Sequence, residues 1–188
     1  MRGGISESLK KLTAGALLSA LGVSLLALGA LFETLDLTMA ALASFTCVFA
    51  VIEFGGGYPW LIYAVTGILS IVLMPYSMAG WFYLLFFGYY PILKDKLERL
   101  RKPVSWIFKI LVFNTSLFIC AVAVDFIFLG MKVSVFEAMS YMLGDLGKFA
   151  ALIYVMLNLV FVIYDIALTR LIGFYYAKLR DRFRFLRK

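Results

Sequence analysis

Hydrophobic residues along this 188-residue chain occur in long blocks separated by short polar or glycine-containing breaks. A helix needs about 20 apolar residues to cross a bilayer, and several of the blocks approach that length. Lipid offers no partners to backbone polar groups, so such blocks are expected to be helices, and strand-type alternation is absent. The pattern predicts an all-α membrane protein with a single integral membrane domain, residues 1–188. Six transmembrane helices are expected at about residues 12–32, 37–54, 60–74, 76–93, 104–124 and 148–170.

Two breaks carry glycine and proline together. In the sequence GGGYP at 55–59, the glycines allow a tight reversal and Pro59 suits the first turn of the next helix. Gly88 and Pro91 are expected to bend or end the fourth helix. A short amphipathic helix on the inner membrane surface is then expected, because apolar residues recur at roughly helical spacing among the charges at Ile92, Leu93, Leu97 and Leu100.

The distribution of basic residues predicts the orientation. The segment KDKLERLRK at 94–102 has five basic and two acidic residues, and such a cluster beside a span marks the cytoplasmic side. With six spans, both termini are cytoplasmic, including the basic tail 171–188. Of the 18 lysines and arginines, only Lys132 and Lys148 then fall outside. The net charge of +7 is therefore explained by residues flanking membrane segments, and no nucleic-acid partner is expected.

The residue inventory excludes several kinds of chemistry. The chain has no histidine, which removes histidine-based catalysis and the commonest ligand of transition metals. Its two cysteines, Cys47 and Cys120, lie far apart inside apolar runs and are interpreted as small hydrophobic residues. No Walker-type, GxSxG or intramembrane-protease motif is present. We therefore expect neither an enzyme nor a bound metal or cofactor.

Ionisable and amide side chains occur at membrane depth in the last two spans. Lys109 and Asp165 lie at matching depths from the inner ends of their helices, which favours a structural ion pair over a transport role. Asn114 and Asn158 lie near mid-membrane. They are expected either to form a hydrogen bond between the helices or to line the floor of a polar cavity. Tyr154 shares a helix face with Asn158 and Asp165.

The outer segments are acidic, and the longest of them, 125–147, is long enough to form a lid or cap. Their acidic residues are consistent with a rim that favours a cationic or zwitterionic solute, or they are merely tolerated on that side. The candidate substrate-binding residues are Glu33, Asp36, Asp125, Tyr141, Asp145, Tyr154 and Asn158.

The first span contains the small-residue motif AxxxA at Ala16 and Ala20, a spacing that lets membrane helices approach closely. The motif serves either packing within the protein or docking of another subunit. Together with the six-span plan, the size and the sequence FGYYP at 87–91, it resembles the S component of an energy-coupling factor (ECF) transporter. That resemblance implies a bacterial or archaeal plasma-membrane subunit that binds a vitamin-like micronutrient with high affinity.

The resemblance also implies a solute pocket in the outer half, formed by spans four to six and nearby loops. Ala16 and Ala20 are expected to contact a membrane coupling subunit, and partner proteins supply two ATPases. The alternative is a non-transporting scaffold or accessory subunit of an envelope complex. An importer subunit predicts a polar outer cavity and an exposed small-residue face on the first span. A scaffold predicts a tightly filled bundle whose polar residues are all satisfied internally.

Overall fold

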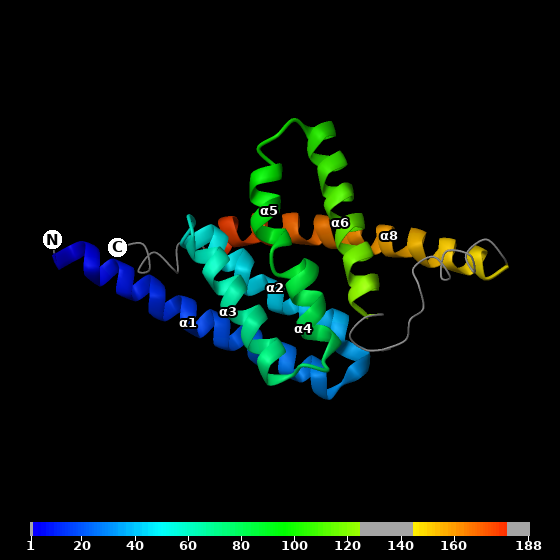
Figure 1. Cartoon of the computed structure of the whole chain (residues 1–188). Helices are drawn as coiled ribbons and strands as arrows, with labels where there is room; N and C mark the ends of the chain where they lie inside the picture. The colour runs from blue at the N-terminus through cyan, green and yellow to red at the C-terminus, as the bar shows by residue number, and fades with distance from the viewer. Residues whose placement is uncertain (1, 125–144, 180–188) are drawn as a thin grey trace.

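The computed structural model describes residues 2–124 and 145–179, and every regular element within them is a helix (Figure 1). The first part contains α1 (Arg2–Leu31), a 3-10 turn (Glu33–Leu35), α2 (Asp36–Glu53) and α3 (Tyr58–Leu73). The second part contains α4 (Met78–Phe82), a π-helical segment (Tyr83–Phe87), α5 (Tyr90–Leu97), α6 (Lys102–Val124), α8 (Asp145–Phe174) and a second π-helical segment (Tyr175–Leu179). The prediction of an all-α fold is confirmed.

Four helices in the described residues are long and apolar enough to cross a membrane. These stretches are Ser8–Leu31, Asp36–Glu53, Lys102–Ala123 and Leu152–Lys178. Helix α3 is apolar but has only 16 residues. The fourth expected span, 76–93, is not one continuous α-helix, because α4, the first π-helical segment and α5 divide it. At the far end, α8 continues past residue 170, where the basic tail is expected to begin.

The glycine-rich break between α2 and α3 forms the expected reversal. Gly55 and Gly56 have φ angles of +59° and +58°, in the left-handed region that favours glycine. Pro59 lies in the first turn of α3, where its missing N–H is not needed by the helix. Both positions agree with the sequence prediction.

The break near Gly88 is a π-helical turn packed against two tyrosine rings. The Gly88 N–H donates to the carbonyl of Tyr83 at 2.7 Å, five residues earlier, which closes a π-helical turn. A Cβ atom at Gly88 would lie 2.6 Å from Tyr63 Cδ2 and 2.8 Å from Tyr83 Cε1, so two tyrosine rings occupy the space of a side chain. The helix resumes at Tyr90 with Pro91 in its first turn, as the sequence predicts.

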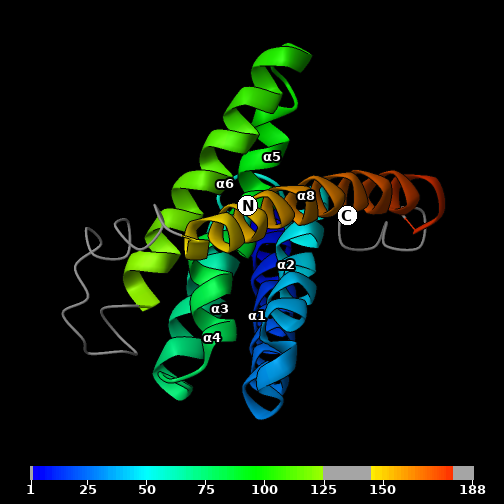
Figure 2. The same ribbon diagram turned by 90° about the vertical axis from the view of Figure 1, so that its right-hand side faces the viewer.

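The helices form three spatial groups. Helices α1 to α4 pack together, α5 and α6 form a hairpin that projects from them, and α8 lies across this hairpin in both views (Figures 1 and 2). At the crossing, Asp165 of α8 meets basic side chains from both α5 and α6.

Two buried clusters form the core. The first, within the α1–α5 region, is rich in small residues and comprises Leu26, Ala40, Ala43, Cys47, Ala50, Ile62, Ala79, Tyr83 and Ile92. Small side chains let these helices approach closely. The second joins α2, the first π-helical segment, α5, α6 and α8 through Val48, Phe86, Tyr90, Phe113, Phe161 and Leu168. In this second cluster the rings of Phe113 and Phe161 stack at 4.5 Å with an interplanar angle of 10°.

Candidate functional site

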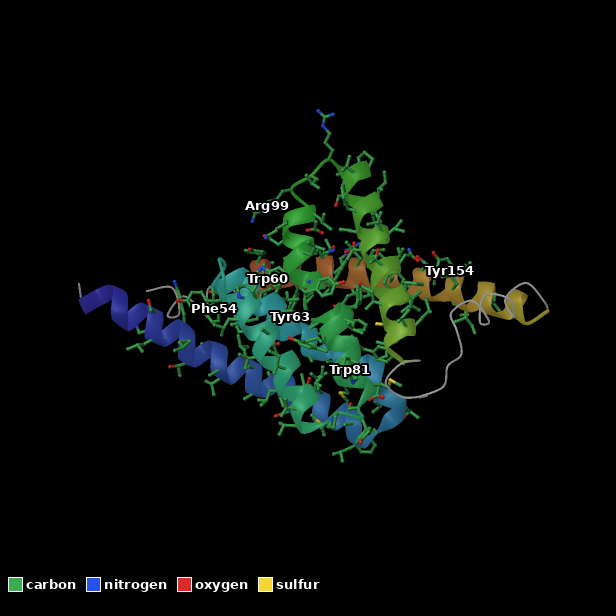
Figure 3. All side chains as sticks on the ribbon, viewed as in Figure 1. Phe54, Trp60, Tyr63, Trp81, Arg99 and Tyr154 are labelled. Atoms are coloured by element: carbon green, nitrogen blue, oxygen red, sulfur yellow. The ribbon has the colours of Figure 1, made fainter. Side chains whose placement is uncertain are left out.

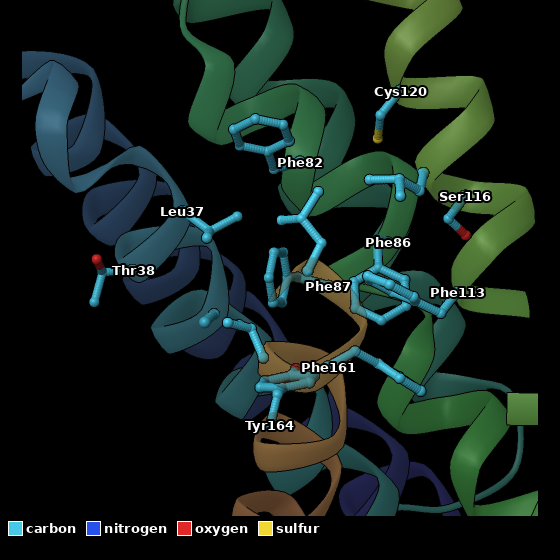
Figure 4. Close-up of a pocket in the computed structure, with 14 residues that line it drawn as sticks. Leu37, Thr38, Phe82, Phe86, Phe87, Phe113, Ser116, Cys120, Phe161 and Tyr164 are labelled. Atoms are coloured by element: carbon cyan, nitrogen blue, oxygen red, sulfur yellow. The ribbon is translucent and has the colours of Figure 1, made fainter. Parts of the chain in front are cut away.

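A cavity of about 580 Å³ lies between α2, the α4–π segment, α6 and α8 (Figure 4). It is bordered by the first turn of α2, the end of α4 and the last part of α6 before Val124. Its lining residues are Leu37, Thr38, Ala41, Phe82, Phe86, Phe87, Phe113, Ser116, Leu117, Cys120, Leu157, Val160, Phe161 and Tyr164. The volume is within the range of small-molecule sites.

Six of the fourteen described residues that line this cavity are aromatic, and none of the fourteen is charged. Two of the hydroxyl groups already have partners in the protein. The Ser116 hydroxyl donates to the Val112 carbonyl at 2.8 Å and also contacts the Tyr89 hydroxyl. The Tyr164 hydroxyl lies 2.8 Å from Ser44 Oγ. The cavity therefore offers mainly apolar and aromatic surface, which differs from the polar cavity expected from the sequence.

A buried charge network lies next to the aromatic cluster that lines the cavity. Asp165 of α8 is at its centre, and its side chain is 3% exposed. Its carboxylate pairs with Lys94 of α5, lies 2.9 Å from Lys109 Nζ of α6, and accepts a 2.6 Å hydrogen bond from the Tyr90 hydroxyl. The Lys94 ammonium also donates to the Asp165 carbonyl at 3.0 Å and to Thr169 Oγ1 at 2.8 Å.

Glu98 completes the charge balance of this network. Its carboxylate lies 2.9 Å from Lys94 Nζ and 3.3 Å from Lys109 Nζ. Two acidic groups thus face two ammonium groups, of which Lys94 is 1% and Lys109 5% exposed. A buried charge is tolerated when it is paired and hydrogen-bonded, and this arrangement fixes α5, α6 and α8 relative to one another.

The pairing of Lys109 with Asp165 agrees with the sequence prediction, whereas the part played by Lys94 is not predicted. The charge density of the 94–102 segment predicts that the whole segment lies at the surface. A usable signal was present: Tyr90, Lys94 and Glu98 follow at intervals of four, which places them on one face of a helix. That face carries all of α5's contribution to the charge network.

Tyr154 and Asn158, two candidate binding residues, lie four residues apart on α8, where Tyr154 is labelled in Figure 3. The Tyr154 hydroxyl donates to Asn114 Oδ1 at 2.5 Å, and Asn114 Nδ2 donates to Asn158 Oδ1 at 3.2 Å. The two asparagines therefore form the hydrogen bond between helices that was one of the two expectations. Neither Tyr154 nor Asn158 lines the aromatic cavity.

The other candidate binding residues lie elsewhere. Asp36, in the first turn of α2, lines a separate recess of about 660 Å³ with Tyr76 and Met78. Glu33 lies in the 3-10 turn, and Asp145 is the first residue of α8. Asp125 and Tyr141, with most of the proposed lid 125–147, lie outside the described residues.

The small residues of α1 divide between two faces. Gly15 and Ser19 are buried, and a Cβ atom at Gly15 would contact the Ile62 side chain at 3.6 Å. Ala16 and Ala20 are exposed. Packing against α3 thus uses the Gly15 face, while the AxxxA motif lies on the surface of the protein.

Comparison with known proteins found no family model, curated protein or solved structure that matches this chain.

Proposed function

We propose that this chain is the substrate-binding membrane subunit of a multi-subunit, ATP-driven importer, as in ECF transporters, and that the aromatic cavity receives the solute. The proposal includes six membrane-crossing segments with both termini in the cytoplasm. Four long apolar helices support it, with α3 and the α4–α5 segment as the remaining two crossings. The basic residues of the α5–α6 connection support the orientation.

The observation that carries the proposal is the cavity itself. It opens to the outside of the bundle, and its lining is mostly apolar with a few polar groups, as is common in small-molecule sites. Here a volume of about 580 Å³ lies among five phenylalanines contributed by four separate segments. In the proposed orientation it lies in the outer half of the protein, toward the start of α2 and the end of α6.

The lining defines the chemistry of the solute. Phe82 and Phe87, which are half-buried, present aromatic surface from the α4–π segment, and the edges of the buried rings of Phe86, Phe113 and Phe161 complete the wall. Aromatic rings favour a flat ring in offset or edge-on contact. We infer a small, uncharged solute with a planar apolar part, in place of the cationic or zwitterionic solute suggested by the acidic outer segments.

The exposed face of α1 supports the second part of the proposal, which is the docking of a coupling subunit. Ala16 and Ala20 leave a shallow surface on which another membrane helix can approach closely. We assign this face to a membrane coupling subunit, which joins the chain to two partner ATPases. The buried Gly15 and Ser19 explain why internal packing leaves the alanine motif available.

Solute retention tests the proposed cavity. The protein is purified from its native host in mild detergent, and its bound small molecules are measured by native mass spectrometry. Ala41→Phe places a ring in the cavity and is expected to abolish retention, whereas Ala121→Phe on the exposed face of α6 preserves it. Equal retention by both variants, or no retained solute in the unmodified protein, contradicts the proposal.

A non-transporting scaffold is the alternative, and the charge network favours it. Lys94, Lys109 and Asp165 all find partners within the protein, as a purely structural network requires. In that case the Ala41→Phe variant is at least as stable as the unmodified protein, because the ring gains dispersion contacts with the apolar walls of the cavity. Its assembly with partners is unchanged.

A further inference from the structure

A second hollow, of about 520 Å³, lies between the start of α6 and the C-terminal half of α8. It shares no lining residue with the aromatic cavity, and three members of the buried charge network, Glu98, Lys109 and Asp165, line it. Its other lining residues include Lys102, Ser105, Trp106, Ile166 and Arg170.

The hollow carries excess positive charge. The ammonium groups of Lys94 and Lys109 are balanced by Asp165 and Glu98 within the network. Lys102 and Arg170 also line the hollow, and neither forms an ion pair with another residue in the described part of the chain. An anion entering the hollow thus meets two positive charges that are not already neutralised.

Ser105 contributes a hydroxyl group to the lining of the hollow, and the residue as a whole is 5% exposed. A phosphate oxygen in the hollow would accept the Ser105 hydroxyl hydrogen, and hydrogen bonds to charged groups are stronger than those between neutral groups.

The surroundings resemble a membrane interface. Trp106 is 39% exposed, and its ring lies 5.4 Å from Lys109 Nζ, which restrains its position. Tryptophan is enriched at the level of lipid headgroups. Leu100 and Ile166 add exposed apolar surface at the edges of the hollow, against which an acyl chain can lie.

We propose that this hollow binds the phosphate headgroup of an anionic phospholipid of the inner leaflet. Lys102 and Arg170 neutralise the phosphate, Ser105 donates a hydrogen bond to it, and the apolar edges receive the acyl chains. The apolar edges and Trp106 favour a lipid over free phosphate. This site goes beyond the proposed transport function, and it holds equally if the protein is a scaffold.

The test measures lipid binding to the full chain in mild detergent by native mass spectrometry. Phosphatidylglycerol and phosphatidylcholine with identical acyl chains are titrated separately. One phosphatidylglycerol is expected to bind in preference to phosphatidylcholine. The double variant Lys102→Gln/Arg170→Gln is expected to weaken its binding by about tenfold or more, because basic residues at a lipid surface each contribute substantially.

The matched control removes the same charge elsewhere. Lys10→Gln/Lys178→Gln changes two exposed lysines outside the hollow and is expected to leave binding within about twofold. An equal loss in both double variants indicates diffuse attraction to the surface and overturns the proposal.

Ser105→Ala keeps the charge constant and is expected to weaken phosphatidylglycerol binding several-fold while leaving weak phosphatidylcholine binding unchanged. Undiminished binding by Ser105→Ala overturns the assigned role of the hydroxyl. Displacement of the lipid by millimolar inorganic phosphate identifies free phosphate as the ligand and also overturns the lipid proposal.

Discussion

The Lys94 ammonium of α5 pairs with the Asp165 carboxylate of α8 and donates a 3.0 Å hydrogen bond to the backbone carbonyl of the same residue. The two residues are 71 positions apart in the sequence, and both side chains are almost fully buried. Since Lys109 and Tyr90 also bond to Asp165, this one residue holds together α5, α6 and α8.

Removal of the central carboxylate is expected to be the most damaging single change in the network. Asp165→Leu leaves two buried ammonium groups with only Glu98 as a shared partner, and breaking a buried pair in this way costs about 3–5 kcal/mol. The double variant Lys94→Met/Asp165→Leu keeps the Lys109–Glu98 pair and is expected to be more stable than Asp165→Leu alone. Thermal unfolding in mild detergent measures the difference.

The control for that series is Arg99→Gln. Arg99 pairs with Asp95 at 2.8 Å on the exposed side of the α5–α6 connection. An exposed pair contributes about 1 kcal/mol or less, so the melting temperature is expected to change little. If Lys94→Met/Asp165→Leu is less stable than Asp165→Leu alone, the charge network as described is contradicted.

The hydroxyl of Tyr90 is expected to contribute separately from its ring. Tyr90→Phe keeps the aromatic contacts with Phe86 and Phe161 but removes the 2.6 Å hydrogen bond to Asp165. Hydrogen bonds to charged groups contribute about 1.5–3 kcal/mol. The melting temperature should fall, whereas Tyr76→Phe on the surface should leave it unchanged. Equal melting temperatures for the two variants would show that the hydroxyl does not stabilise the network.

Gly88→Ala tests the break in the fourth segment. The added methyl group meets the rings of Tyr63 and Tyr83 at less than van der Waals distance, and overpacking of this kind costs about 1–3 kcal/mol. Gly173→Ala in α8 meets no atom within 4 Å and should be neutral or stabilising. The melting temperatures of the two variants are compared. A Gly88→Ala variant that is as stable as the unmodified protein would contradict the close approach of the two tyrosine rings.

The two native cysteines test whether the cavity is accessible, and no additional cysteine has to be introduced. Cys120 lines the aromatic cavity, whereas Cys47 is fully buried with its Sγ 3.1 Å from the Tyr83 hydroxyl. N-ethylmaleimide is expected to modify the Cys47→Ser variant, which retains Cys120, and to leave the Cys120→Ser variant unmodified while the protein is folded. Intact mass measures the modification. Faster modification at Cys47 would show that the cavity is not accessible as described.

Helix locations follow closely from the sequence because they depend on local properties. Apolar length and the breaks at Gly55–Gly57 and Gly88 are sufficient to place most helix ends within a few residues. The pairing of Asn114 with Asn158 was one of two expectations, since equal depth alone does not distinguish a hydrogen bond from a cavity floor.

The arrangement of helices in space was not predictable in the same way. A helix that is apolar on all sides carries little information about which face its neighbours cover, so the crossing of α8 over the α5–α6 hairpin was missed. Lys94 was missed because its partner is distant in sequence and its neighbours are charged. The aromatic lining of the cavity is not apparent from the sequence, because phenylalanine in a membrane helix is equally suited to packing against other helices, facing lipid or lining a cavity.

The most direct test of the proposed importer subunit is affinity purification from the native host in mild detergent, followed by identification of the proteins that accompany the chain. A membrane coupling subunit and two ATPases are expected to accompany the unmodified protein. The same partners should accompany the Ala121→Leu control and be lost from the folded Ala16→Leu/Ala20→Leu variant. Recovery of the intact protein with no ATPase, or undiminished recovery of the partners with the Ala16→Leu/Ala20→Leu variant, contradicts the proposal.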